Sequence, residues 1–202
     1  MTRRGVEHRP AAPGRPAVEI HRSQRRRRGA AARPRGEVVE VRLPADLPAS
    51  EEERLITGLV EKVTGRARAE ALGGDQALQV RADELADRYL EGVRAASVTW
   101  SARMTRLLGS CTPAHGTIRI SREVAAFPGW VRDYVLVHEL AHLVVADHSP
   151  AFHDLLARYP HAERAHGWVE GYKAGRLAAA QPAPDPPEDP SSSPPSSGSR
   201  VP

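Results

Sequence analysis

Hydrophobic positions in the first half of the chain follow first a strand pattern and then a helical one. Residues 37–43 are rich in β-branched side chains and end before a proline, which predicts a strand. Ser50 and Glu53 form a capping-box pattern, and the apolar residues that follow recur at helical spacing up to Gly73. A second helical stripe covers residues 82–93. The pattern therefore predicts one strand followed by two core-facing helices.

The second half of the chain changes between the two periods again. Short alternations of apolar and polar residues predict strands, glycine and proline mark turns, and a dense apolar run without internal Gly or Pro predicts a buried helix. A serine followed by a proline then opens a short helix. Strands are expected over 98–101 and 117–120 with a turn-rich segment at 109–116 between them, and helices over 130–146, over 149–156 and from 160.

The two ends of the chain differ in composition from the middle. Residues 1–35 carry eleven arginines against Glu7 and Glu19, mixed with Pro, Gly and Ala and without a sustained apolar period. Residues 178–202 are rich in Pro and Ser. Such segments bury too little apolar surface to offset the entropy of ordering. We therefore expect both ends to be disordered and residues 36–177 to form one α+β domain.

Composition also excludes several classes of protein. A single cysteine among 202 residues excludes an internal disulfide framework and is typical of a reducing compartment, so a cytoplasmic location is expected. The chain has neither an apolar run long enough to span a membrane nor the apolar core of a secretory signal. Arg25 to Arg28 form a basic run that could contact nucleic acid. Because no aromatic residues interleave it, a solvated extension is the preferred interpretation.

The strongest chemical signal is His138-Glu139-Leu140-Ala141-His142, an H-E-x-x-H motif inside the expected buried helix. Residues four apart share one helix face, so the two imidazoles can converge on one metal ion. Glu139 emerges beside that ion, where it suits a base that acts on water. The composition of the chain predicts only about 0.03 chance occurrences of this motif. We therefore interpret it as a metal site rather than as two core histidines.

A catalytic zinc ion takes three protein ligands and leaves one position open, and three residues could be the third ligand. His148 stands six residues after His142 and would point about 240° away on a continuous helix, so the helix must end before it. His153 lies on the next expected helix. Glu163 stands 21 residues after His142 in a polar stretch. Spacing alone leaves these three alternatives open.

The positions 138, 142 and 148 also match the ligand spacing of the metzincins. That family needs a glycine where this chain has Val145, and a methionine turn downstream of the motif. Both methionines, Met1 and Met104, precede the motif, so a metzincin is excluded.

Four segments in this order resemble a known family. They are Gly109-Ser110-Cys111, Gly116-Thr117-Ile118-Arg119-Ile120, the run from Asp133 to Leu143 that contains the H-E-x-x-H motif, and His148-Ser149-Pro150-Ala151-Phe152. Over roughly residues 80–175 the chain resembles the YgjP-like metallopeptidases, relatives of the SprT-like and WLM zincins. The ordered set of segments is much more specific than H-E-x-x-H alone.

The resemblance implies a fold, a cofactor and an activity. The fold would be a small zincin-like α+β domain, in which a short mixed sheet packs on helices that include the motif helix. Zinc (Zn²⁺) would be held by His138, His142 and His148, with Glu139 as the catalytic base and a peptide or protein as substrate. A substrate strand could add beside residues 117–120.

Some residues depart from the family pattern or have two interpretations. Leu107-Leu108 stand where the family usually has Arg-Trp, which affects the shape and charge of the cleft edge. His153 stands where a Trp is usual, which favours packing over ligation. Cys111 is interpreted as a small buried residue rather than a reactive thiol or a ligand. Tyr134 is interpreted as a packing residue rather than a group that stabilises the transition state.

The sequence is also compatible with two other functions. A metal-activated water also attacks non-peptide bonds, so the protein could hydrolyse a substrate such as a nucleotide phosphoanhydride. In a different class, it could be a non-catalytic module associated with nucleic acid through the arginine-rich segment. Its zinc would then be structural and closed by a fourth ligand, His153 or Cys111.

Overall fold

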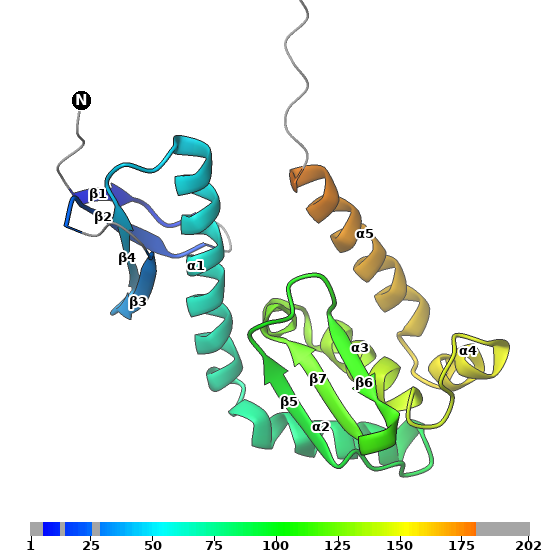
Figure 1. The fold of residues 1–202 in the computed structure, drawn as a ribbon. Coiled ribbons are helices and arrows are strands. Elements are labelled where there is room, and N and C mark those ends of the chain that lie inside the picture. Colours follow the sequence, from blue (N-terminus) through cyan, green and yellow to red (C-terminus); the bar gives the residue numbers. More distant parts are fainter. Residues whose placement is uncertain (1–5, 13–14, 26–28, 181–202) are drawn as a thin grey trace, which may run out of the picture.

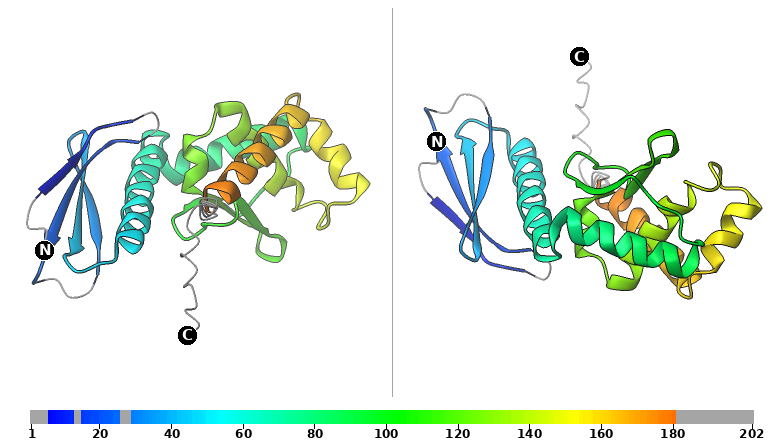
Figure 2. Two further views of the ribbon diagram at one scale, coloured as in Figure 1. Left: turned by 90° about the horizontal axis from the view of Figure 1, so that it is seen from above. Right: turned by 90° about the horizontal axis from the view of Figure 1, so that it is seen from below.

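The computed structural model describes residues 6–12, 15–25 and 29–180, and these contain two separate hydrophobic cores. A four-stranded sheet packs on the long helix α1 around the first core, and a three-stranded sheet with four helices surrounds the second (Figure 1). Helix α1 lies between the first sheet and the rest of the molecule in both views of Figure 2.

The first unit buries one face of its sheet against α1. Buried apolar residues of β2 and β4 alternate with polar ones and meet Ile56 and Val60 of α1, as expected for a sheet with one solvated face. The strand order is β1-β2-β4-β3, in which β2 and β4 pair in parallel and the two edge strands are antiparallel. The elements of this unit are β1 (Val6–Arg9), β2 (Ala17–Ser23), β3 (Ala31–Arg35), β4 (Val38–Pro44) and α1 (Ala49–Ala71).

The expectation that residues 1–35 are disordered is wrong for the part of this range that the structure describes. Three of the four strands come from it, and Val18 and Ile20 supply apolar side chains to the first core. Charge pairing explains how an arginine-rich segment is ordered. Arg22 binds Glu52 of α1 at 2.5 Å and Glu7 of β1 at 2.5 Å, so an arginine ties the sheet to the helix.

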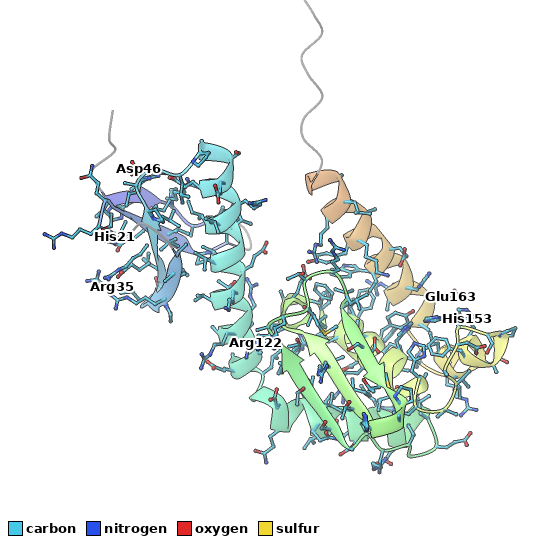
Figure 3. The ribbon with its side chains drawn as sticks, viewed as in Figure 1. His21, Arg35, Asp46, Arg122, His153 and Glu163 are labelled. Carbon is cyan, nitrogen blue, oxygen red and sulfur yellow. The ribbon has the colours of Figure 1, made fainter. Side chains whose placement is uncertain are left out.

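The expected domain boundaries change accordingly. A domain boundary at residue 36 would separate β4 from its partner strands β2 and β3. The two cores instead meet along α1, which supplies buried residues to both. Gly65 of α1 lies against Arg122, where a Cβ atom would come within 3.3 Å of the arginine Cβ (Figure 3). At the other end, the last helix continues to Ala180, and the remainder of the expected tail lies outside the described residues.

The second unit has the expected α+β architecture. Helices α2 and α3 cover one face of the three-stranded sheet, where Val98, Trp100, Ile118 and Ile120 are buried. A paired Arg81 and Asp133 join α2 to α3 at 2.7 Å. The elements are α2 (Gly74–Tyr89), β5 (Ser97–Ser101), β6 (Gly109–Thr112), η1 (Pro113–His115), β7 (Thr117–Ser121), η2 (Arg122–Ala126), α3 (Gly129–Ala141), α4 (Pro150–Ala157) and α5 (Ala162–Ala180).

The order of this sheet, β5-β7-β6, corrects two expectations. Residues 109–112 form the strand β6 and not part of a turn, because they pair antiparallel with β7. The segment 117–120 lies in the central strand β7, with both sides occupied, so a substrate cannot add there. The accessible edge beside α3 is β6.

Most of the helices lie close to their expected positions. The strand over 38–44 and the helices that begin at Pro150 and Ala162 confirm the pattern analysis. Helix α1 begins at Ala49 and has Pro48 at its N-cap, and no side-chain capping bond forms, so the capping box at Ser50 was wrong. No helix among the described residues is both long and apolar enough to cross a membrane.

The folding of the first unit can be tested with a buried and an exposed side chain of the same sheet. We expect Ile20→Ala to lower the free energy of unfolding of this unit by about 2–5 kcal/mol, because Ile20 is fully buried and its removal leaves a cavity. Val6→Ala, at a residue that is 48% exposed, is the matched control. Urea unfolding combined with hydrogen exchange of residues 38–44 measures both. Equal stability of the two variants would show that β2 does not pack against the first core.

Candidate metal centre

Three histidines converge where α3 ends. His138 lies in the last turn of α3, His142 is its C-cap residue, and His148 returns from the following loop. One ligand atom from each lies within 4.8 Å of the other two. The Nε2 atoms of His138 and His148 are 3.2 Å apart. Among the described residues, this is the group that brings three metal-ligating side chains together.

An early end of α3 makes this convergence possible. The helix was expected to continue to residue 146, but it ends at Ala141. The amide of Val144 donates to the Ala141 carbonyl at 3.0 Å, and that of Val145 donates to the same carbonyl at 2.9 Å. These bonds close the last turn and redirect the chain toward α4, which begins at Pro150. His148 therefore does not continue the helical rotation that would carry it away from His142.

Phe152 of α4 contacts all three imidazoles. Its ring is fully buried and stacks on His142 with a centroid separation of 4.5 Å. It meets His138 edge-on at 5.0 Å and His148 edge-on at 4.7 Å. Close packing on one rigid ring limits the rotamers that the histidines can adopt. The site is therefore held in shape by α3 and α4 together.

The protonation of the imidazoles suits metal binding. Nδ1 of His142 lies 3.2 Å from the carbonyl oxygen of Val145, which only accepts, so this nitrogen carries the proton and Nε2 keeps its lone pair. Burial, with a contribution from the neighbouring histidines, lowers the pKa of His138 to about 4. Burial also lowers the pKa of His142. Both rings are therefore neutral at pH 7, the form that binds a metal ion.

Glu139 lies beside this group in an apolar environment. Its residue is 6% exposed, and burial raises the pKa of its carboxyl group to about 7. The side chain packs on the backbone of β6 at Gly109. A Cβ atom at Gly109 would lie 2.7 Å from both Cγ and Cδ of Glu139, so only glycine leaves room for the carboxylate in this position.

Tyr134 and His166 flank the site on the side of α5. The hydroxyl of Tyr134 and Nδ1 of His166 are 3.3 Å apart, and the rings of Tyr134 and His138 lie 6.3 Å apart between centroids. Tyr134 is 6% exposed, and burial raises the pKa of its hydroxyl. The residue packs within the core, as the sequence predicted, and its hydroxyl also meets a polar partner.

The rival ligands lie apart from the three histidines. His153 and Glu163 lie on α4 and at the start of α5 (Figure 3), and both are exposed. Neither belongs to the group of converging ligand atoms, and the half-buried Cys111 does not belong to it either. Burial, with a smaller contribution from the Glu139 carboxylate, raises the pKa of the Cys111 thiol to about 11. Cys111 is therefore a protonated thiol at neutral pH, which argues against ligation and against a reactive role.

The donor set fits a metal ion such as zinc. Ligand nitrogens at about 2.0–2.1 Å from a tetrahedral ion lie roughly 3.3 Å apart, close to the 3.2 Å between His138 and His148. Two imidazole nitrogens that face each other at this distance have room for one proton between them, and a cation can bind both of them. Three imidazole ligands beside a carboxylate are typical of catalytic rather than structural zinc sites.

Phe152 and Gly109 shape this site but were not predicted to do so from the sequence. Phe152 stood within the family-like segment without a role, and Gly109 was expected in a turn. A glycine at the start of a short strand often marks a close approach of another group, and this was the available signal. Nothing in the local sequence indicates which group approaches Gly109, because Glu139 is thirty residues away.

Comparisons with known proteins place this geometry in a family. A solved structure titled as the metallopeptidase zymogen of Pyrococcus abyssi abylysin is 20% identical and covers 47% of this chain and 93% of its own, with a TM-score of 0.42. None of the curated proteins matches the chain. The model of the family described as "YgjP-like, metallopeptidase domain" matches residues 66–171.

The matched range contains the second unit from the end of α1 to the middle of α5, and with it all three histidines and Glu139. The first sheet lies outside it. Because the match covers more than half of the 202 residues, it confirms the family resemblance: the chain belongs to the YgjP-like metallopeptidase family.

Proposed function

We propose that this protein is a zinc-dependent peptidase in which His138, His142 and His148 hold the ion and Glu139 is the general base. The observation that carries the proposal is the convergence of three imidazoles beside a buried carboxyl group. Membership of a metallopeptidase family supports a peptide or protein substrate. The chemistry of the donor set supports zinc, which prefers nitrogen ligands in tetrahedral sites.

The ion, when bound, supplies Lewis acidity, which lowers the pKa of a coordinated water and polarises the carbonyl of the substrate. The chain itself supplies the movement of the proton. Glu139 takes a proton from the attacking water and returns it to the leaving amine. Burial raises the pKa of this carboxyl group, which makes it a stronger base than an exposed glutamate. Gly109 and the apolar surroundings hold the carboxylate in place.

Strand β6 is the part of the sheet that can align a substrate. It is an edge strand, and its first residue, Gly109, touches Glu139. A peptide that pairs with β6 would run past the carboxylate in an extended form. This corrects the site of strand addition from the central residues 117–120 to β6.

Two observations disfavour the alternative functions. A structural zinc site needs four protein ligands, and the described residues bring three together, without His153 or Cys111. Hydrolysis of a phosphoanhydride needs cationic side chains around the phosphates. The pocket beside the site contains one lysine, Lys173, and no arginine among its lining residues, and Lys173 pairs with Glu170 at 2.9 Å. A peptide therefore fits this site better than a nucleotide.

The third ligand can be identified by zinc content. We expect the full chain to hold about one zinc ion and His148→Ala to lose most of it, because two imidazoles remain. His153→Ala and Glu163→Ala are matched controls from the same region and should keep their zinc. Elemental analysis after zinc loading and dialysis measures all four proteins. Full zinc in His148→Ala, with loss in either control, would overturn this ligand assignment.

Glu139→Gln separates the role of the base from that of a ligand. The amide keeps the size of the side chain but cannot accept the proton, so turnover should fall by about 10²–10⁴-fold. Zinc content should be unchanged, because the three imidazoles remain. Peptide-library hydrolysis and zinc analysis of the same preparations measure both effects. Turnover at the wild-type level would show that Glu139 is not the base, and loss of zinc would show that its carboxylate supports the metal.

Gly109→Ala tests whether the position of the carboxylate matters. The added Cβ would overlap with Glu139 and displace it, and a displacement of about 1 Å can lower the rate on the order of 10²-fold. Zinc should remain, because the atoms nearest to the added Cβ all belong to Glu139. The control is Gly171→Ala on α5, where a Cβ meets nothing within 4 Å. A wild-type kcat for Gly109→Ala would contradict the requirement for glycine.

A further inference from the structure

A pocket of about 590 Å³ continues from the metal centre toward α5. His138, Glu139 and His148 form part of its lining, so the pocket and the candidate site share one space. The other residues of the lining come from the start of β6, from α3 and α4, and from one side of α5. His153 and Glu163, which are labelled in Figure 3, also belong to the lining. A group bound here would lie directly beside the reacting atoms.

The inner wall of this pocket is apolar and rigid. Besides Tyr134, five of its side chains belong to the second core, and each is less than one-tenth exposed. Leu107 also lines the pocket and has 61% of its surface exposed, so it adds an accessible apolar side chain to this wall. Pockets that bind specific ligands combine such apolar walls with a few polar groups. The buried wall residues are Leu108, Val135, Phe152, Leu156 and Val169.

Beyond the metal centre and His153 of α4, the polar residues of the lining lie on α5. Glu163, His166, Glu170 and Lys173 recur at intervals of three and four residues, so they follow one face of the helix. Lys173 already pairs with Glu170, which leaves no lysine or arginine of the lining to receive an acidic side chain. The charged groups outside the metal centre therefore form a rim along α5, and the wall between this rim and the three histidines is apolar.

We propose that this pocket binds a bulky apolar side chain of the substrate, such as leucine, methionine or phenylalanine, next to the bond that is cut. This inference rests on the proposed peptidase function and assigns its side-chain specificity. The apolar wall supplies the affinity, and β6 beside it supplies the backbone pairing that directs the side chain into the pocket. The lining has no unpaired lysine or arginine that could bind an acidic side chain. The side chain of glycine or alanine is too small to cover the apolar wall.

Ala162 offers a way to fill the pocket without replacing a fully buried core residue. It is the first residue of α5, half-buried, and lines the pocket. A phenylalanine at this position can extend into the pocket from the helix surface. Ala174 is the matched control, because it lies on the same helix, is exposed and is not part of the pocket lining.

The test compares zinc-loaded full-length protein with Ala162→Phe and Ala174→Phe on hexapeptides of glycine and alanine. Each peptide carries one variable residue, which is Gly, Ala, Leu, Phe, Glu or Lys. We expect wild type and Ala174→Phe to cleave beside Leu or Phe with a kcat/KM at least about tenfold above that for Ala, and Ala162→Phe to lose most of this preference. A wild type without apolar preference, or with a preference for Lys directed by Glu163, would overturn the proposal. An unchanged preference in Ala162→Phe would also overturn it.

Binding of the same peptides to zinc-loaded Glu139→Gln separates this inference from the proposed function. If the wild type cleaves no peptide but Leu and Phe peptides still bind to this variant at least about tenfold more tightly than Ala peptides, the apolar subsite stands and the peptidase assignment falls. If cleavage occurs but Kd does not depend on the variable residue, the subsite falls and the peptidase assignment stands. Calorimetry measures these affinities independently of turnover.

Discussion

The end of α3 is the constraint on which the rest of the site depends. Two histidines four residues apart share a helix face automatically, but a third ligand can join them only if the chain reverses direction within a few residues. The bonds from Val144 and Val145 to the Ala141 carbonyl close the helix and produce this reversal. Phe152 then stabilises the result, because its buried ring touches all three imidazoles. The loop before α4 therefore supplies His148 to the candidate metal centre, and α4 itself supplies the ring of Phe152 that packs against the histidines.

Burial of Glu139 follows from the same arrangement. Its carboxyl group lies between α3 and the first residue of β6, where water has little access, and this raises its pKa to about 7. An ionised carboxylate in such a place is unfavourable unless a cation or a proton accompanies it. The lowered pKa values of His138 and His142 keep these two rings uncharged at neutral pH, but an ion held by the three histidines would supply the charge. The proposed ligand set and the proposed base are thus complementary, since a metal ion bound by the histidines would also favour the charged form of the carboxylate.

The parts of the structure that could be predicted from sequence depend on local geometry. The spacing of His138 and His142 fixes their common face, and Ser149-Pro150 marks the start of α4 wherever the rest of the chain lies. The strands of residues 6–35 could not be recognised in the same way, because they are four to seven residues long and are stabilised by pairing with one another or with β4 and by packing on α1. The alternation around Val18 and Ile20 was a signal, but the surrounding arginines obscured it. Contacts such as that of Gly109 with Glu139 depend on the assembled fold and have no local signature.

The first unit is also connected physically to the wall of the pocket. Helix α1 packs on η2 where Gly65 meets Arg122. The next residue of η2, Glu123, accepts a hydrogen bond from the Tyr172 hydroxyl and pairs with Arg176, both on α5. Phe127, which follows η2, packs against Trp168 and Tyr172 with ring centroids 4.6 and 4.7 Å away. The element that supports α1 is therefore the element that anchors α5. Since α5 carries Val169 and the polar rim of the pocket, the shape of the substrate site depends on contacts that begin in the N-terminal unit.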